Sequence, residues 1–199
     1  MRRPEPSSRC DRCSTDVPSY DTVHTTIDSH PRLLCNRCFN ALVAERSGVD
    51  FEHPEFAPVV LEDAAGERHA FHFRTRLGGD HVAVEAFEIQ DGSPGGYQFQ
   101  VLGDADADVL ATFQQLFERM RRALRRRHVE DGEVGAQIVK SDEGWILRGQ
   151  IEWDEEEDGR VPRLVIDGRS YTWDEVGRML TSFEGFHVKL EVHDKSEER

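Results

Sequence analysis

The only cysteines of this chain are Cys10, Cys13, Cys35 and Cys38, and they form two Cys-x-x-Cys pairs. Two residues between paired cysteines make a tight turn that directs both sulfur atoms to a common point. Two such pairs can surround one tetrahedral ion, and the spacing is typical of structural zinc sites. We therefore predict that the four cysteines bind one Zn²⁺. Four thiolates leave no coordination position for water, so we expect no catalysis at this metal.

Other interpretations of the cysteines remain open at this point. They could form disulfides or stay unligated, and His24 or His30 could replace one cysteine at the metal. Iron-sulfur and redox proteins use the same Cys-x-x-Cys spacing, so iron is a further alternative.

A second candidate site lies in a predicted hairpin around Gly78 and Gly79. A two-residue turn at these glycines places His72 opposite Glu85 and Arg76 opposite His81. A histidine beside a carboxylate can act as a general base, although a cross-strand polar pair on a wet face is the simpler interpretation. The sequence contains no Ser-His-Asp arrangement, phosphate loop or dinucleotide fingerprint that would support an enzyme.

Two charged runs could bind ligands. The basic run comprises Arg119, Arg121, Arg122, Arg125, Arg126 and Arg127. It could contact phosphate, or it could be a solvated helix face that the acidic stretches 130–133 and 152–158 neutralise. The stretch 152–158 could in turn hold Ca²⁺ or Mg²⁺, but it lacks the glycine and the ligand spacing of a calcium loop, which favours a solvated hairpin loop.

The composition favours a cytoplasmic protein with a protein partner. The net charge is -14 and the sequence pI is about 5.0, so the surface as a whole repels nucleic acid. Arginine supplies nearly all the positive charge, which fits GC-rich coding or a halophile. We find neither an apolar signal core nor a run of roughly 20 apolar residues, so no membrane segment is expected. Reduced cytosolic thiols favour a metal over disulfides.

The cysteine segment has its own predicted elements. Residues 22–27 and 32–34 are β-prone and are separated by a turn at 28–31. A helix follows Cys38, with Phe39, Leu42 and Val43 on one face, and Gly48 ends it. The helix N-terminus would stabilise thiolate charge.

The order knuckle, hairpin, knuckle, helix resembles the treble-clef or zinc-ribbon modules. The closest similarity we can name is to the zinc-binding domain of the ClpX unfoldase, in which the second knuckle also leads directly into a helix. The resemblance covers residues 10–47, and no ATPase motif follows. It implies a zinc module used for protein contacts, with the four cysteines as ligands.

The rest of the chain predicts antiparallel strands with one long and one short helix. Strands are expected from Val59 through a hairpin to residue 102, followed by a helix over about 104–128. Further strands are predicted at 145–153, 163–166 and 186–192. Thr172 and Glu175 form a capping box that starts the short helix. Trp145, Trp153 and Trp173 have apolar neighbours and are expected in the core.

The whole sequence therefore predicts an α+β protein. We expect a disordered lead-in at 1–9, a zinc-binding module at 10–50, an α+β domain at 51–193 and a charged tail at 194–199. The chain also resembles uncharacterised bacterial proteins that join a zinc ribbon to an α+β domain of unknown function. The similar stretch runs from Ile166-Asp-Gly-Arg to Phe183-Glu-Gly-Phe186.

We expect a structural-zinc protein of the binding or adaptor kind, acting on a protein partner. Removing zinc should unfold residues 10–47 and leave the larger domain largely intact. The alternatives are a nucleic-acid-associated regulator that uses the zinc module and the Arg119–Arg127 helix, and an enzyme with a site near His72 and Glu85. The oligomeric state stays open.

Overall fold

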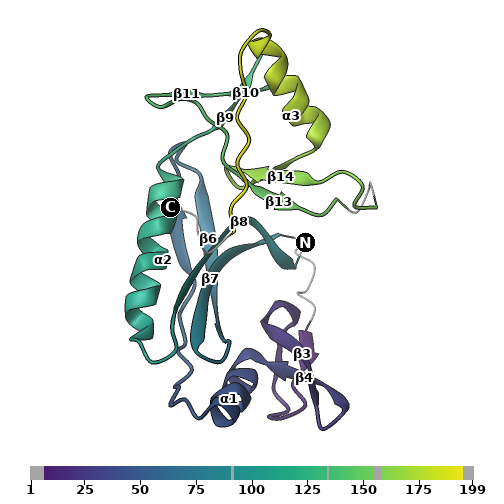
Figure 1. Ribbon diagram of the computed structural model, residues 1–199, viewed down its shortest axis with the longest axis vertical. Coiled ribbons are helices and arrows are strands. Elements are labelled where there is room, and N and C mark those ends of the chain that lie inside the picture. The colour runs from purple at the N-terminus through teal and green to yellow at the C-terminus, as the bar shows by residue number, and fades with distance from the viewer. Residues whose placement is uncertain (1–6, 91, 134, 155–157, 195–199) are drawn as a thin grey trace.

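The computed structural model describes residues 7–90, 92–133, 135–154 and 158–194. These residues form a mixed α+β structure with three α-helices and many antiparallel strands, in agreement with the predicted class. Figure 1 shows the cysteine segment at one end, a four-stranded sheet in the middle and the C-terminal part at the other end. No helix of the described chain is long and apolar enough to cross a membrane.

The N-terminal part contains four strands and one α-helix. Its elements are β1 (Ser7–Arg9), β2 (Asp16–Pro18), the 3-10 helix η1 (Ser19–Asp21), β3 (Thr22–Ile27), β4 (His30–Cys35) and α1 (Asn36–Ser47). The β3–β4 hairpin forms as the sequence indicates. The predicted helix also forms, but it begins at Asn36, inside the second knuckle, and not after Cys38. Gly48 ends α1 in the left-handed region at φ 69°. Residues 7–9, expected in the disordered lead-in, instead pair with β2, and residues 1–6 lie outside the described chain.

The central part is an antiparallel sheet in the order β5-β6-β7-β8, covered on one face by α2. Its elements are β5 (Val59–Glu62), β6 (Arg68–Leu77), β7 (His81–Gln90), β8 (Ser93–Asp104) and α2 (Val109–Leu124). Alternate side chains of the sheet and one stripe of α2 form the core. The buried members are Phe71, Val84, Ala86, Phe99, Leu116, Met120 and Leu124. The helix is shorter than predicted because Asp108, not Asp104, caps it by accepting a hydrogen bond from the Leu110 N–H.

The β6–β7 turn differs from the predicted two-residue turn. Leu77 pairs with Val82, and the Gly78 N–H donates to the His81 carbonyl at 2.8 Å, so four residues form the turn. This register places Arg74 opposite Glu85 and His72 opposite Phe87. The predicted pairs of His72 with Glu85 and of Arg76 with His81 are therefore wrong.

The C-terminal part contains short strands and a small core of its own. The elements are β9 (Val129–Gly132), β10 (Gly135–Ile138), β11 (Lys140–Ser141), β12 (Gly144–Trp145), β13 (Gln150–Glu152), β14 (Arg163–Ile166), β15 (Arg169–Tyr171), α3 (Trp173–Leu180) and the 3-10 helix η2 (Thr181–Phe183). Val129, Ile166, Val176 and Met179 form its buried centre. The predicted capping box of Thr172 and Glu175 is confirmed, with both reciprocal hydrogen bonds present. Residues 51–193 thus hold separate hydrophobic clusters in the central and C-terminal parts. A third cluster joins Leu77, Val82 and Ala105 to Ala44 of α1.

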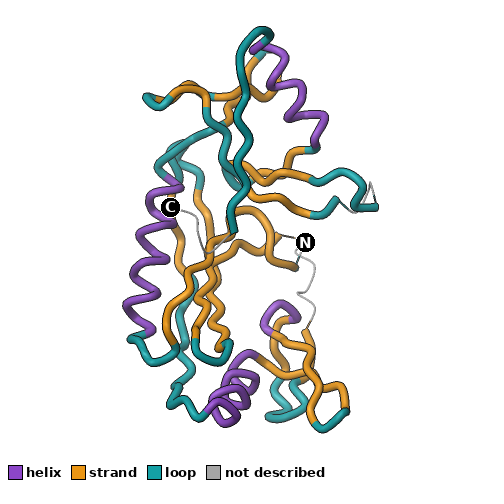
Figure 2. Tube along the Cα trace, viewed as in Figure 1, coloured by secondary structure: helices purple, strands orange, loops and turns teal. Residues whose placement is uncertain are grey.

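Three expectations for the C-terminal part are wrong. The strand predicted at 145–153 is interrupted, with β12 and β13 in different sheets. Residues 186–192 form no strand and are drawn as a loop in Figure 2. The three tryptophans are exposed, by 46% for Trp145, 68% for Trp153 and 46% for Trp173. The short elements of this part offer too little apolar surface to cover them.

Candidate metal centre

The fold brings the four cysteines together. The sulfur atoms of Cys10, Cys13, Cys35 and Cys38 all lie within 4.8 Å of one another, and the Cys13 and Cys35 sulfurs are 3.9 Å apart. Four sulfurs at 2.3 Å from a tetrahedral zinc ion would be about 3.8 Å apart. Three of the cysteines are buried and Cys13 is exposed. The donor set and its spacing therefore fit a metal ion.

The first knuckle is held by its own backbone. The Cys10 N–H donates to the Thr15 carbonyl at 3.0 Å, and the Ser14 N–H donates to the Cys10 carbonyl at 2.9 Å, with Ser14 at φ 60°. Asp11 fixes the knuckle to β4, because its N–H and carboxylate both bond the backbone of Leu33 at 2.8 Å. The Cys35 N–H donates to the Cys10 sulfur at 3.3 Å, which joins the two knuckles.

The surroundings divide the thiols into two pairs. Hydrogen bonds from the Thr15 side chain and backbone lower the pKa of Cys13 to about 6. Burial raises the pKa of Cys10, but backbone N–H groups of the knuckles outweigh it and the net shift is downward. Burial raises the pKa of Cys35 and Cys38 above the usual thiol value. A cation among the four sulfurs would favour the thiolate form of Cys35 and Cys38.

Very little apolar material surrounds these cysteines. Leu34 is the one other buried residue of their hydrophobic cluster, with partly buried Val17, Ile27, Phe39 and Leu42 around it. So small a core is typical of segments that a metal or disulfides stabilise. His24 and His30 are exposed and do not join the cluster among the described residues. The His30 Nδ1 instead contacts the Asp28 carbonyl at 2.7 Å.

Helix α1 docks on an open stretch of strand β6. Strand β5 pairs only with residues 68–71 of β6, so the following backbone groups lack a strand neighbour on that side. The buried Asn40 side chain takes its place, donating to the Thr75 carbonyl at 2.8 Å and accepting from the Leu77 N–H at 2.9 Å. Asn40 was not among the residues predicted to be functional. The available signal was Asn36 and Asn40 on one helix face, because asparagine is a poor helix former.

The residues of the predicted enzyme site lie at the same interface between the N-terminal part and the central sheet. The Tyr20 ring packs edge-on against Phe87 and His72, with centroids 5.6 and 5.9 Å away. Arg74 donates to the Tyr20 carbonyl at 2.8 Å and also pairs with Glu85. His72 and Glu85 therefore contribute to the contact between the N-terminal part and the central sheet.

The arginines near the end of α2 are partly engaged within the chain. Arg119 donates to the Gln100 carbonyl at 2.6 Å, and Arg127 donates to the Val129 carbonyl at 2.8 Å. Arg121 pairs with Glu118 and Arg126 with Glu143. The side chains of Arg122 and Arg125 are exposed and form no ion pair or hydrogen bond with the described residues.

The acidic stretch 152–158 is only partly described, since residues 155–157 lie outside the described chain. Glu152 accepts from Gln98 at 2.8 Å, and buried Asp154 lies 3.8 Å from Arg163. These two side chains are therefore engaged within the protein.

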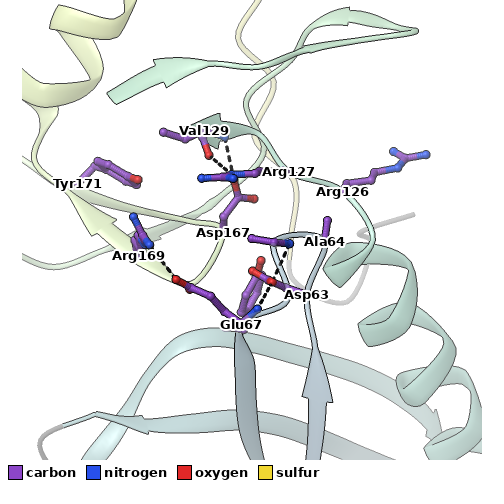
Figure 3. A pocket seen from close by; sticks show the side chains of 11 residues that line it. Asp63, Ala64, Glu67, Arg126, Arg127, Val129, Asp167, Arg169 and Tyr171 are labelled. Atoms are coloured by element: carbon purple, nitrogen blue, oxygen red, sulfur yellow. Dashed lines mark hydrogen bonds and ion pairs between the residues drawn. The ribbon is translucent and has the colours of Figure 1, made fainter. Parts of the chain in front are cut away.

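The turn between β14 and β15 connects the C-terminal part to the central sheet (Figure 3). Asp167 accepts from the backbone N–H groups of His128 and Val129 at 2.7 and 2.8 Å. Gly168, at φ 73°, lies against the Tyr97 ring, where a Cβ would meet ring carbon at 2.8 Å. Arg169 bonds both Glu67 and Asp131 at 3.1 Å, and the two carboxylates raise its pKa. The Ile-Asp-Gly-Arg stretch therefore forms part of the interface between the C-terminal part and the central sheet.

Fold and site define a mixed α+β protein with a four-cysteine cluster able to hold a metal ion. Three protein-family models match consecutive stretches of the chain, and all three are described as domains of unknown function. They are DUF7685 over residues 9–50, DUF7686 over 52–125 and DUF7713 over 128–197. The three matches correspond to the three parts of the structure. Neither the curated proteins nor the solved structures gave a match.

Proposed function

We propose that Cys10, Cys13, Cys35 and Cys38 bind one structural Zn²⁺ in a treble-clef or zinc-ribbon module. The observation that carries the proposal is the approach of all four sulfurs to within 4.8 Å in a segment with almost no other core. Four cysteines fill a tetrahedral shell, so the ion would stabilise the fold and bind no substrate.

Metal analysis of the purified protein tests this assignment. We expect one zinc per chain and, after exchange, the visible spectrum of tetrahedral thiolate cobalt. Cys13→Ser should lower the zinc content, whereas Ser14→Gly should keep it, because glycine tolerates the positive φ at this position. Purified protein that contains no zinc would overturn the proposal, as would a circular dichroism spectrum that stays unchanged when a chelator removes the metal. An absorption spectrum typical of an iron-sulfur cluster would show that the four cysteines bind iron and not zinc.

We further propose that the protein acts through protein contacts made by its C-terminal segment. Phe186, Val188, Leu190 and Val192 are exposed by 64 to 83% and alternate with polar residues. Trp145, Phe183 and Phe186 form an adjoining aromatic cluster with ring centroids 5.5 to 5.9 Å apart. An extended segment with one apolar side can add to the open edge of a partner's sheet. The occupant we propose is such an edge strand of a protein partner.

Site-specific photo-crosslinking tests this surface. A crosslinker at position 188 or 190 should capture the same protein, and one at exposed Arg46 of helix α1 should not. The double variant Val188→Glu, Leu190→Glu should abolish capture in competition while leaving the unfolding temperature unchanged. Equal capture from all three positions, or capture that survives the double variant, would contradict the proposal. Self-crosslinking would identify the partner as a second copy.

Exposed Arg122 and Arg125 favour one other candidate, a nucleic-acid contact. The net charge of -14 and the internal partners of the neighbouring arginines argue against it. Salt-dependent binding to generic duplex DNA or RNA that is lost in Arg122→Ala, Arg125→Ala would support this candidate. Absence of binding at low salt would exclude it.

A further inference from the structure

A second group of metal-ligating side chains lies at the loop between β5 and β6. Ligand atoms of Asp63, Glu67 and His69 lie within 4.8 Å of one another, and the His69 Nε2 is 3.4 Å from the Asp63 Oδ2. Two ligands at about 2.05 Å from a tetrahedral ion would be about 3.3 Å apart. The spacing therefore fits a single cation between them.

His69 is the residue that points to a ligand. It occupies an inward-facing position of β6, where Phe71, two residues further along the same face, belongs to the core, and it is only 8% exposed. Its Nδ1 lies 2.9 Å from the Glu88 Oε1, so the imidazole can donate its proton there and present a lone pair at Nε2. Nε2 is buried and has no hydrogen-bond partner among the described residues.

The loop holds Asp63 so that one of its carboxylate oxygens is available as a ligand beside the His69 Nε2. The Asp63 Oδ1 accepts hydrogen bonds from the N–H groups of Ala65 and Glu67 at 2.9 and 2.8 Å. The Ala64 N–H donates to the Leu124 carbonyl at 2.7 Å, which ties the loop to the end of α2. The Oδ2, which no hydrogen bond occupies among the described residues, faces His69.

We propose that Asp63, Glu67 and His69 bind a divalent first-row transition cation, with Glu88 as the carboxylate that orients His69. A histidine whose second ring nitrogen contacts a carboxylate is the usual arrangement of metal-ligating histidines. One imidazole with two carboxylates suits ions such as Mn²⁺ or Zn²⁺ and differs from the four thiolates of the cysteine cluster. Three protein ligands also leave coordination positions open.

A small cavity, which Arg126, Arg127 and Arg169 also line, lies beside the cluster. Asp63 and Glu67 line this cavity of about 20 Å³ between the central sheet and the C-terminal part, shown in Figure 3. That volume is room for about one water. Arg169 bonds the Glu67 Oε1 at 3.1 Å, which leaves Oε2 for the ion. An ion at this site would lie at the interface between the central sheet and the C-terminal part, separate from the cysteine cluster.

The competing explanation is a protonated His69 that bridges Asp63 and Glu88 without any metal. The two differ in the state of one ring nitrogen, because a metal needs a neutral imidazole with a free Nε2. Nitrogen NMR of the histidine rings distinguishes the neutral tautomer protonated at Nδ1 from a histidinium.

The decisive experiment titrates the zinc-loaded full chain with Mn²⁺ and follows free Mn²⁺ by electron paramagnetic resonance. Mn²⁺ competes poorly with zinc for thiolates, so it reports on this site. We expect one bound Mn²⁺ per chain and broadening of the His69 signals. Asp63→Asn keeps the Oδ1 acceptor and can donate to Nε2, so it should fold normally yet weaken binding at least 100-fold. Glu88→Gln should weaken it about 10- to 100-fold.

His81→Ala is the matched control, because His81 also lies beside a carboxylate, at 3.1 Å from Asp80, but is exposed. It should bind Mn²⁺ as the unchanged protein does. Two results would overturn the proposal: no Mn²⁺ binding by the folded protein, or binding that Asp63→Asn leaves intact. A His69 histidinium at neutral pH in the Mn²⁺-free protein, unaltered by Mn²⁺, would also overturn it in favour of the bridging cation.

Discussion

The Asn40 side-chain oxygen accepts a hydrogen bond from the Leu77 N–H at 2.9 Å, across 37 residues of sequence. Together with the bond from the Asn40 amide to Thr75, it satisfies two backbone groups of β6 that no strand covers. Unpaired edges invite association with other chains, and here a helix side chain occupies the edge. The cysteine segment is therefore attached to the sheet by polar contacts inside a buried interface.

Asn40→Ala should destabilise the protein by about 2 to 4 kcal/mol, because it leaves buried backbone groups without partners. For a chain of this size, each kcal/mol lowers the melting temperature by roughly 2 to 4 °C. Thermal and urea unfolding measure the change. Arg46→Ala, at an exposed position of the same helix, should have little effect. Equal stabilities of the two variants would show that the contact contributes nothing.

Chelation of the ion that we propose at the cysteines should affect more than residues 10–47. Once α1 loses its support, Asn40 no longer covers β6, so the amide of Leu77 should exchange faster in hydrogen-exchange mass spectrometry. Amides of β14, in the distant C-terminal part, should be unaffected and serve as the internal reference. Unchanged exchange of the Leu77 amide would contradict this prediction and would show that removing the metal leaves the larger domain intact.

Acidification should weaken the same interface through His53. Burial lowers the pKa of His53 below its usual value of 6.5, and its Nδ1 lies 2.8 Å from the Asn40 amide, which requires a neutral ring. A base with a lowered folded-state pKa binds fewer protons when folded than when unfolded. Its contribution is therefore complete above about pH 6.5 and declines as the pH falls toward the folded-state value.

His53→Gln should remove this part of the pH dependence. The measurement is the free energy of unfolding between pH 7.5 and 5.5, with the metal content checked at each pH because acid also releases metal from thiolates. The difference between the unchanged protein and the variant isolates His53. A difference that is constant with pH would contradict the assignment.

Two glycine substitutions should act in opposite directions. Gly168→Ala places a Cβ against the Tyr97 ring and forces alanine to φ 73°, so it should destabilise by about 1 to 3 kcal/mol. Gly177→Ala lies in α3, where a Cβ meets nothing within 4 Å, and should stabilise by about 0.5 to 1 kcal/mol. Urea unfolding of both variants checks the signs. A neutral Gly168→Ala would mean that the β14–β15 turn does not pack on Tyr97.

Features set by neighbouring residues were predictable from the sequence, and features set by distant ones were not. The knuckle spacing, the β3–β4 hairpin and the Thr172 capping box depend on residues a few positions apart, and all form as the pattern indicates. The turn at Gly78 allowed both a two-residue and a four-residue loop, and the Gly78 to His81 hydrogen bond selects the longer one. That change of register removed the pairing of His72 with Glu85.

Long-range partners account for the rest. Nothing near Asn40 in the sequence indicates Leu77, and nothing near His69 indicates Glu88, because pairing of the strands brings them together. The sequence does contain one signal for His69. Its polar ring stands two and four residues before Phe71 and Phe73, and this alternation places it on the inward face of β6. The prediction that the tryptophans are buried was wrong because apolar neighbours in the sequence do not ensure that enough helices and strands pack around them.

Helix α2 reaches both ends of the central sheet. At its first residue, Val109 packs with Ala44 and Leu77 beside the cysteine segment, and at its last residue the Leu124 carbonyl binds the loop that carries Asp63. Its 16 residues span about 24 Å. Because one rigid helix contacts both the α1 interface and the loop that carries Asp63, a change in its tilt would move both contacts together.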